Sequence, residues 1–505
     1  MLQRLDSFFK ISERGSSIKT EIIAGLTTFF AMAYIVVVNP NQIVGFNFGG
    51  EFDTIWNAVY VASILVAVIG TLLYAFYAKM PYAQACGMGL NSFFFTACVL
   101  PNVIAGSSPI EGYRQGLLII VLSGVIFLVL SITGVRTYIA KALPDCLKKA
   151  IPAGIGLFIA FIGFKNVGVI QANQYTFVQF FDFHGVISAV GKTLGEMSAD
   201  GLSRGVVESY TSYFNYDFTR VATGLDAWRI IAPVVIALLG LFTIAVLDKK
   251  QVKGSVIITI ASATVVYYLT TWQLPSFDLG KIGQSFVDFG KEGLFGAFGG
   301  FGVFAGGITA VVNAIVLTIT FCLVDMFDTI GTLYGTASQA NMLDENGDPI
   351  EIEKCMQCDS IATVTGGLLG TSTCTTFVES SAGVAAGGRT GLSSLVTAAC
   401  FFLCLFLSPV AAIVPACATA PALMYVGVLM LKNFGKVDMS DITSAIPAFL
   451  ALIMMPLTYS ISNGIAIGAI AYTIITLACG KFTKKDIVVT VIGILFTLRF
   501  FLVSM

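Results

Sequence analysis

The sequence GTSTCTTFVE occupies residues 370–379 and interrupts an otherwise apolar part of the chain. Threonine is branched at Cβ and favours extended backbone, so most of this segment is predicted to be a short strand. Residues 81–89, PYAQACGMG, are equally unsuited to a helix because Gly87 and Gly89 lower helix propensity. We therefore predict a short extended piece followed by a half-helix in each segment.

The composition of the chain places both segments in a membrane. Hydrophobic residues make up 56% of the 505 residues, charged residues make up 11%, and the mean hydropathy is +0.87. Spans of about 20 residues leave room for about fourteen crossings and no separate soluble domain. The net charge of −1 gives no reason to expect nucleic acid binding. Non-helical backbone at membrane depth must line protein or a wet cavity, so we expect a cavity at these segments.

The apolar windows predict an all-α membrane protein, apart from the short extended pieces in the third and tenth crossings. The predicted spans are 20–39, 55–78, 82–100, 114–135, 150–170, 229–247, 253–271, 308–335, 356–370, 371–388, 391–410, 412–431, 445–460 and 462–480. A further hydrophobic segment, 487–505, contains Arg499 and is either a fifteenth crossing or an interfacial helix.

Lysine and arginine gather on one side of this arrangement, in the loops around 136–149, 249–253 and 481–485. This bias marks the cytoplasmic side, so residues 1–19 are predicted to be a cytoplasmic amphipathic N-terminus. Residues 171–228 then form an ordered, aromatic-rich extracellular insert. We expect a multi-pass protein of the cell (inner) membrane.

The two halves of the chain resemble each other weakly. Span five contains FIAFIGFKN (158–166) and span twelve contains YVGVLMLKN (425–433), while Asn91 in span three corresponds to Glu379 in span ten. A chance likeness between apolar helices is the alternative. If the repeat is real, seven spans per half is an odd number, so the halves form a 7+7 inverted repeat with a site near the midplane.

Three acidic side chains lie inside these apolar segments: Asp325, Asp328 and Glu379. A charge at the centre of a spanning helix costs roughly 2.5–3.5 kcal/mol on insertion scales, so these acids indicate a transport site. Asp325 and Asp328 share one helix face, and together with Glu379 they are expected to hold one or more protons near neutral pH. The alternative is a structural role, with hydrogen bonds to backbone amides or to hydroxyls such as Thr329.

Asn91 and Glu379 stand at the starts of the two predicted half-helices, where they form a two-sided clamp. An ordinary N-cap is the alternative for Asn91. With aromatic residues such as Tyr34, Phe93 and Phe377, these groups suit a flat neutral heterocycle, because carboxylates accept from ring N–H and amine groups and aromatic faces stack. An inorganic anion is disfavoured because Glu379 would repel it.

The sequence contains no recognisable set of catalytic or metal-binding residues. The single histidine, His184, is remote from the C-x-x-C pair of Cys355 and Cys358, and one such pair supplies half of a tetrahedral zinc site. The cysteines are interpreted as buried packing residues. We therefore expect no metal, no cofactor and no enzymatic activity.

Four motifs, in order, resemble those of the AzgA-like purine permeases, which belong with the nucleobase-ascorbate transporters. They are EIIAGLTTFFAMAYIVVVNP (21–40), CGMGLNSFF (86–94), DMFDTIGTL (325–333) and TFVESSAG (376–383). The resemblance spans nearly the whole chain. It implies a UraA-like fold of fourteen spans in two inverted sevens, and proton-coupled uptake of adenine, guanine or hypoxanthine by alternating access.

The resemblance also implies how the chain divides and which residues act. A core domain, 20–135 and 308–410, is expected to move against a gate domain, 150–271 and 412–480. The implied substrate-site residues are Asn91, Asp325, Phe377, Val378 and Glu379. Proton coupling is expected of Asp325, Asp328 and Glu379. The alternative is a carrier of the same fold for another nucleobase, xanthine or uracil, or for an anion, and a homodimer is compatible with the sequence.

Overall fold

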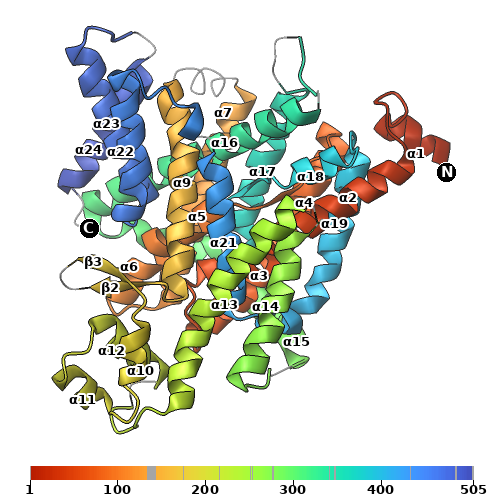
Figure 1. Ribbon diagram of the computed structural model, residues 1–505. Helices are drawn as coiled ribbons and strands as arrows, with labels where there is room; N and C mark the ends of the chain where they lie inside the picture. The colour runs from red at the N-terminus through yellow and green to blue at the C-terminus, as the bar shows by residue number, and fades with distance from the viewer. Residues whose placement is uncertain are drawn as a thin grey trace. The chain divides into compact units, whose positions relative to one another are not determined.

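The computed structural model shows a predominantly helical chain (Figure 1). It describes residues 2–133, 144–173, 176–214, 217–250, 252, 254–275, 278–340, 342–345, 349–432, 434–483 and 486–502. The chain forms two compact units. Unit 1 comprises Met1–Phe158, Asp278–Ala411 and Gly427–Met505, and unit 2 comprises Ile159–Phe277 and Ala412–Val426.

The elements follow one another along the chain with few extended segments. The α-helices are α1 (Leu2–Phe9), α2 (Ile18–Met32), α3 (Ile35–Ile43), α4 (Glu51–Leu73), α5 (Met88–Phe94), α6 (Leu100–Ile104), α7 (Pro109–Ile132), α9 (Asp145–Asn166), α10 (Phe183–Ser188), α11 (Leu194–Ala199), α12 (Arg204–Tyr213), α13 (Gly224–Lys249), α14 (Ser255–Thr271), α15 (Gly280–Asp288), α16 (Gly307–Ala340), α17 (Ile352–Leu369), α18 (Ser380–Ala385), α19 (Gly391–Leu403), α20 (Ser408–Ala412), α21 (Ala416–Leu431), α22 (Ile442–Leu457), α23 (Ile461–Ala478) and α24 (Ile487–Leu502). The strands are β1 (Gln84–Cys86), β2 (Ile170–Asn173), β3 (Phe177–Phe180) and β4 (Cys374–Thr376).

Within the described ranges, eight helical segments are long and apolar enough to cross a membrane. They are Ile18–Ile43, Glu51–Ala78, Pro109–Ile132, Asp145–Asn166, Gly224–Lys249, Gly307–Ile330, Gly391–Ala412 and Ala416–Lys436. Shorter apolar helices are Met88–Ile104, Ser255–Thr271, Ile442–Leu457 and Asn463–Ala478. These helices support the predicted multi-pass membrane protein, because a span of the hydrocarbon core needs about 20 apolar residues.

The two extended segments predicted from the sequence form one antiparallel sheet. β1 pairs with β4, and all residues of both strands are buried. The ladder continues at both ends, where the Gly87 amide donates to the Thr373 carbonyl and the Phe377 amide donates to the Ala83 carbonyl. The pairing satisfies backbone groups that hydrocarbon could not satisfy.

A half-helix follows each strand, as predicted. α5 follows β1 and α18 follows β4. Gly87 is the N-cap residue of α5, because the backbone turns from extended to helical there (φ −68°, ψ 116°). Asn91 therefore lies one turn inside the helix, and the alternative of Asn91 as an N-cap is wrong. Glu379 occupies the N-cap position of α18 without a side-chain capping hydrogen bond.

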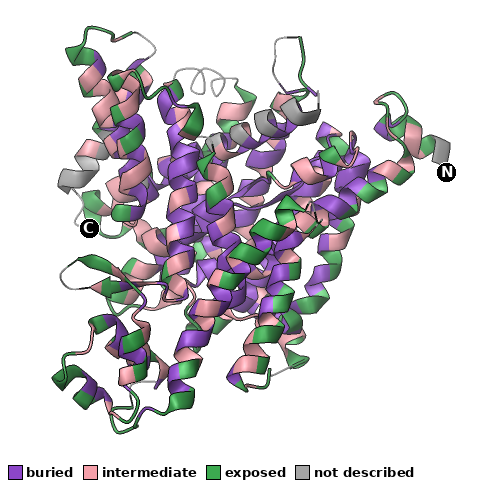
Figure 2. Ribbon diagram, viewed as in Figure 1, coloured by how far each residue is buried: buried purple, intermediate pink, exposed green. Residues whose placement is uncertain are grey.

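Helices of unit 1 enclose this small sheet. α4 packs against β1, and α16 and α17 pack against β4. A glycine allows the close approach of α4, since a Cβ at Gly70 would lie 2.3 Å from the Gln84 side-chain oxygen. Figure 2 shows buried residues in purple along these helices. The polar backbone of the sheet is thus shielded by protein on both sides.

The N-terminal residues are fastened to the start of α19. The buried Glu21 carboxylate accepts hydrogen bonds from the amides of Arg389 (2.8 Å) and Ser393 (3.3 Å). Phe9 packs against Leu392 in a buried cluster. The carboxylate meets unpaired amides at a helix N-terminus, where an anion is favoured. Glu21, in the first turn of α2, and Phe9 of α1 therefore stabilise the start of α19 and the residues just before it.

Unit 2 contains the insert predicted at 171–228. β2 and β3 pair antiparallel, and α10 to α12 lead into α13. Thr223 and Asp226 form a capping box at the start of α13, and Arg220 pairs with Asp226 at 2.7 Å. The insert is thus a folded element tied to the spanning helix that follows it.

The predicted C-terminal hydrophobic segment forms α24, which packs against α16 and α23. Residues 503–505 of that segment lie outside the described residues, as do 134, 135, 341 and 346–348 of the predicted core domain and 174, 175, 215 and 216 of the predicted insert.

The close contact of two glycines next to the sheet gives a stability prediction. Gly370 follows α17 with φ +101°, and a Cβ there would lie 2.4 Å from the Gly293 Cα. Gly370→Ala should lower the free energy of unfolding by about 2–4 kcal/mol. The new Cβ would clash with the Gly293 backbone, and alanine is strained in the left-handed conformation of this position. Thermal unfolding in detergent measures the loss.

Gly106→Ala is the matched control, because Gly106 also has a positive φ (+74°) but has no atom within 4 Å of the added Cβ. It should lose only the strain, about 1–2 kcal/mol. Equal losses for the two variants would contradict the close packing at Gly370.

Candidate functional site

Glu379 is held by a tyrosine from a break in the first predicted span. α2 ends at Met32 and α3 begins at Ile35, and Tyr34 lies in the gap between them. The buried Tyr34 hydroxyl donates to Glu379 Oε1 at 2.6 Å. Glu379 itself is half-buried at the start of α18. A hydrogen bond to a charged group fixes the direction of the carboxylate and leaves its other oxygen to act as an acceptor.

Asn91 joins α5 to the segment that leads into β4. Its side-chain oxygen accepts from the Ser372 hydroxyl, and its amide donates to Gln42 Oε1 at 3.2 Å. Asn91 is fully buried. The predicted site residue therefore contacts the start of the other half of the sheet motif.

Asp325 lies on α16 and is fully buried. Its Oδ2 accepts from the Thr363 hydroxyl at 2.6 Å, and the Thr363 oxygen in turn accepts from the Cys374 amide of β4 at 3.1 Å. Its Oδ1 has no hydrogen-bond partner in the described part of the chain. A buried acceptor without a partner is costly, so this oxygen is available for a donor from a bound molecule or for a proton.

Asp328 lies one turn further along α16 and is half-buried. Asp325 and Asp328 are three residues apart on α16 and so share one helix face, where two charged carboxylates would repel each other. No ion pair within the described residues includes Asp325, Asp328 or Glu379. These carboxylates therefore have no basic partner there to balance their charge.

A fourth acid, Asp359 on α17, belongs to the same surroundings and is absent from the site predicted from the sequence. It is fully buried, and its two oxygens accept from Gln84 Nε2 (2.8 Å) and the Thr329 hydroxyl (2.6 Å). Because Thr329 gives its only hydroxyl proton to Asp359, the Thr375 hydroxyl must donate to Thr329 at 2.8 Å. The signal was present in the sequence, since Asp359 is an acid inside the apolar segment 356–370.

β4 and its flanks thus connect to every predicted polar site residue except Asp328. Ser372 contacts Asn91, and the Cys374 amide reaches Asp325 through Thr363. Glu379 follows three residues after the end of the strand. The structure brings Asn91, Asp325 and Glu379 to one short segment of backbone, although they come from different helices.

The remaining predicted residues lie at the end of β4. Phe377 is buried, and its amide and carbonyl bond to Ala83 and to the Ser380 amide. These backbone groups are therefore already occupied by the sheet and by the first turn of α18. Val378 is 42% exposed. Phe93, predicted to stack on a ligand, is buried against Phe321 with ring centroids 5.0 Å apart.

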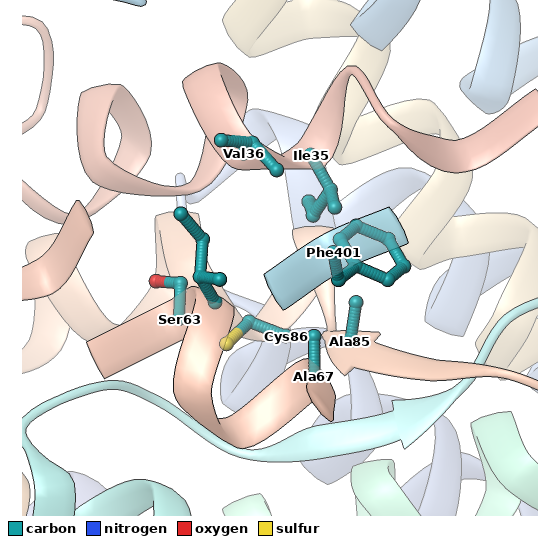
Figure 3. Close-up of a pocket in the computed structure, with 8 residues that line it drawn as sticks. Ile35, Val36, Ser63, Ala67, Ala85, Cys86 and Phe401 are labelled. Carbon is teal, nitrogen blue, oxygen red and sulfur yellow. The ribbon is translucent and has the colours of Figure 1, made fainter. Parts of the chain in front are cut away.

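A narrow crevice lies on one side of β1 (Figure 3). It is lined by Ile35, Val36, Ser63, Ile64, Ala67, Ala85, Cys86 and Phe401. The lining is largely apolar, and the crevice is too narrow to admit a water molecule. None of the predicted acids lines it, so this crevice is not the polar site.

The arrangement suits hydrogen-bond recognition better than metal binding. Within the described ranges, no group of three or more His, Cys, Asp or Glu side chains could hold a metal ion. The buried acids instead accept hydrogen bonds from uncharged side chains, such as Thr363 on Asp325 and Thr329 and Gln84 on Asp359. Carboxylate oxygens of this kind accept N–H or O–H donors from a neutral molecule, or they accept protons.

Comparison with known proteins shows which family the sequence matches. The model named Xan_ur_permease, described as the Permease family, matches residues 19–205 and 222–467. The chain is 37% identical to the guanine/hypoxanthine permease PbuO of Bacillus subtilis, over 98% of this chain and 100% of the relative. It is 33% identical to the adenine permease AdeQ of Escherichia coli, over 99% of this chain and 97% of the relative.

Among solved structures, the chain resembles the transmembrane domain of the cyanobacterial bicarbonate transporter BicA. The TM-score is 0.53 at 14% sequence identity, over 87% of this chain and 96% of that chain. A likeness at this identity shows the fold alone. It supports the mostly helical part of the predicted fold class, while the fourteen spans and the 7+7 inverted repeat stay predictions.

Asp359 gives a second stability prediction. Asp359→Ala leaves the Gln84 amide and the Thr329 hydroxyl without their acceptor in a buried place. The free energy of unfolding should fall by about 2–4 kcal/mol, because unpaired buried donors lose both the bond and their hydration. Thermal unfolding of the purified protein checks this.

Asp53→Ala provides the comparison. Asp53 is an exposed acid on α4 with a hydrogen bond from the Gly49 amide, and its loss should cost about 1 kcal/mol or less. If the two variants unfold alike, Asp359 does not hold the sheet and α16 together.

Proposed function

Because the chain belongs to the Permease family, we propose that it is a secondary active transporter that takes up purine nucleobases together with protons. This membership confirms the predicted resemblance to purine permeases. It also confirms that the chain is a transporter and not an enzyme. The relatives named above are permeases for adenine and for guanine and hypoxanthine. Purines are therefore the first substrates to test.

The observation that carries the proposal is the group of three buried or half-buried carboxylates near β4, those of Asp325, Asp328 and Glu379, which form no ion pair within the described residues. Among the described residues, Asp325 Oδ1 is a buried acceptor without a hydrogen bond, and Glu379 keeps one oxygen beyond its bond to Tyr34. Purine bases are flat and carry ring N–H groups, and adenine and guanine also carry exocyclic amines, so they supply the donors that these oxygens lack. An anion would be repelled by the same groups.

We propose that Asn91, Asp325 and Glu379 contact the base, with Val378 and Phe377 beside it. Asn91 supplies an amide next to the sheet, and the exposed part of Val378 provides an apolar surface for a ring face. Both backbone groups of Phe377 already form hydrogen bonds, so Phe377 has no free amide for the base. It lies beside the base because it directly precedes Val378 and Glu379.

Proton coupling is proposed for Asp325, Asp328 and Glu379. Mutual repulsion between neighbouring carboxylates favours the binding of a proton by one of them. A proton taken up on one side and released on the other would link purine movement to the proton gradient. The runner-up, a carrier of the same fold for xanthine, uracil or an anion, differs in its substrate and is separated by the transport assay below.

The transport cycle proposed here is alternating access between a core domain (20–135 and 308–410) and a gate domain (150–271 and 412–480). We propose fourteen spans as two inverted sevens, a cytoplasmic N-terminus and an inner-membrane location. α13 and α14 of the proposed gate belong to unit 2, whereas α22 and α23 of the proposed gate belong to unit 1. Polar residues within the membrane in such folds mark the substrate and proton path.

Substrate and coupling are tested together by uptake. Cells that express the chain should accumulate radiolabelled adenine, guanine or hypoxanthine, and a protonophore should abolish the accumulation because it removes the gradient. Uracil should not compete. Uptake that survives the protonophore would contradict proton coupling, and preference for uracil would favour the runner-up.

The role of Glu379 is tested by removal of its charge. Glu379→Gln keeps the shape and a hydrogen bond to Tyr34, but it cannot be ionised, so purine uptake should fall to background while the amount of protein in the membrane is unchanged. Glu111→Gln, at an exposed position on α7, should transport normally. Normal uptake by Glu379→Gln would remove this residue from the site.

Tyr34 is predicted to be a positioning residue that acts through Glu379. Tyr34→Phe keeps the ring but removes a hydrogen bond to a carboxylate, which is worth about 1.5–3 kcal/mol, or roughly tenfold to a hundredfold in KM for the purine. Tyr60→Phe is the matched control, because the buried Tyr60 hydroxyl donates to the Cys404 carbonyl and to none of the acids. A raised KM in both variants, or in neither, would contradict the assignment.

A further inference from the structure

The β2–β3 hairpin of unit 2 has one polar face and one apolar face. Residues that face each other across an antiparallel pair lie on the same side of the sheet, and neighbours along a strand alternate. One face carries Ile170, Ala172, Val178 and Phe180. The opposite face carries Gln171, Asn173 and Gln179, with Phe177 at the start of β3. We call the first set the outer face of the hairpin.

The polar face packs against protein at Gln171, whereas the apolar face is exposed at Val178 and Phe180. Gln171 is only 8% exposed, and its amide donates to the Ser209 hydroxyl of α12 at 3.1 Å. Gly205 lets this side chain approach, because a Cβ there would lie 2.5 Å from Gln171 Oε1. On the outer face, Val178 is 46% exposed and Phe180 is 61% exposed. A sheet in water shows the reverse pattern.

Phe177 adds to the exposed apolar surface. Its side chain is 91% exposed, and its backbone has φ +63°, a left-handed conformation that bulky residues rarely adopt. Just before it, the Thr176 amide donates to the Asn173 side-chain oxygen at 3.0 Å. The ring therefore points out of the protein, and Figure 2 colours much of this hairpin as exposed.

The position of the hairpin indicates what covers it. β2 begins four residues after α9 ends at Asn166, and residues 166–181 contain no Asp, Glu, Lys or Arg. The insert then returns to α13, where the exposed side chains of Phe218 and Val221 precede those of Leu225 and Trp228. Only 33% of the apolar window of α13 is buried. The outer face thus belongs to an insert that leads directly into a long apolar helix whose side chains are largely exposed.

We propose that the outer face of the hairpin and the Phe177 ring rest in the lipid interface, where they anchor the insert to the bilayer surface. Aromatic side chains with uncharged neighbours are favoured at this depth, because the rings leave water while nearby polar groups stay hydrated. The anchor follows from the hairpin alone and does not depend on the transported solute.

The contact is tested by photo-crosslinking of the full chain in nanodiscs of palmitoyl-oleoyl phosphatidylcholine and phosphatidylglycerol. p-Benzoylphenylalanine is placed at position 177, at position 180 or, as control, at position 212. Ser212 is exposed on α12 on the same helix face as Arg204 and Glu208, which form an ion pair at 2.6 Å. Irradiated protein is analysed by intact mass spectrometry and by gel electrophoresis.

Lipid adducts should be several-fold more abundant at positions 177 and 180 than at 212. Two labelled positions are used so that a folding defect in one variant leaves the other to decide, and a single symmetric peak in size exclusion with an unchanged Tm identifies the folded variants. Equal adduct yields at all positions would overturn the proposal. A cross-linked dimer from position 177 or 180 would also overturn it, because a second copy and not lipid would then cover this face.

Discussion

The hydrogen bonds between β1 and β4 are the constraint on which the rest of unit 1 depends. Three residues in each strand leave the helical path inside a protein built to cross hydrocarbon, where an unpaired amide or carbonyl has no water to bond. The pairing removes that penalty for both strands at once. It also fixes β4 so that the Cys374 amide reaches Thr363 on α17 and the Thr375 hydroxyl reaches Thr329 on α16. Thr363 and Thr329 in turn donate to the buried Asp325 and Asp359.

Much of this arrangement could be predicted from local sequence. Cβ-branched threonines in 371–376 and the glycines at 87 and 89 oppose a helix, and the structure has a strand and then a half-helix in each segment. Asp325 stood out because an acid in an apolar segment is costly wherever it has no polar surroundings. These features depend only on a residue and its immediate neighbours in the chain. They can therefore be recognised in a single sequence.

The partners of these residues could not be predicted in the same way. No periodicity indicates that β1 meets β4, that Tyr34 donates to Glu379, or that Gln84 donates to Asp359, because each pair joins segments far apart in the chain. Asn91 as an N-cap was a reasonable alternative by residue type, but the flexible Gly87 takes the turn into the helix four residues earlier. The hairpin in the insert was equally hidden, since its unusual polarity appears only when both strands and their register are known.

The pairing of β1 with β4 also has a consequence for the synthesis of the protein. When residues 84–86 leave the ribosome, the strand that will satisfy their backbone has not yet been translated, and more than half of the chain must follow before residue 376 appears. The amides of Arg389 and Ser393, which bind the Glu21 carboxylate, are translated later still. Until then, both groups need water, the translocation machinery or a temporary partner. The first third of this protein can enter the bilayer early, but it can reach its final packing only near the end of translation.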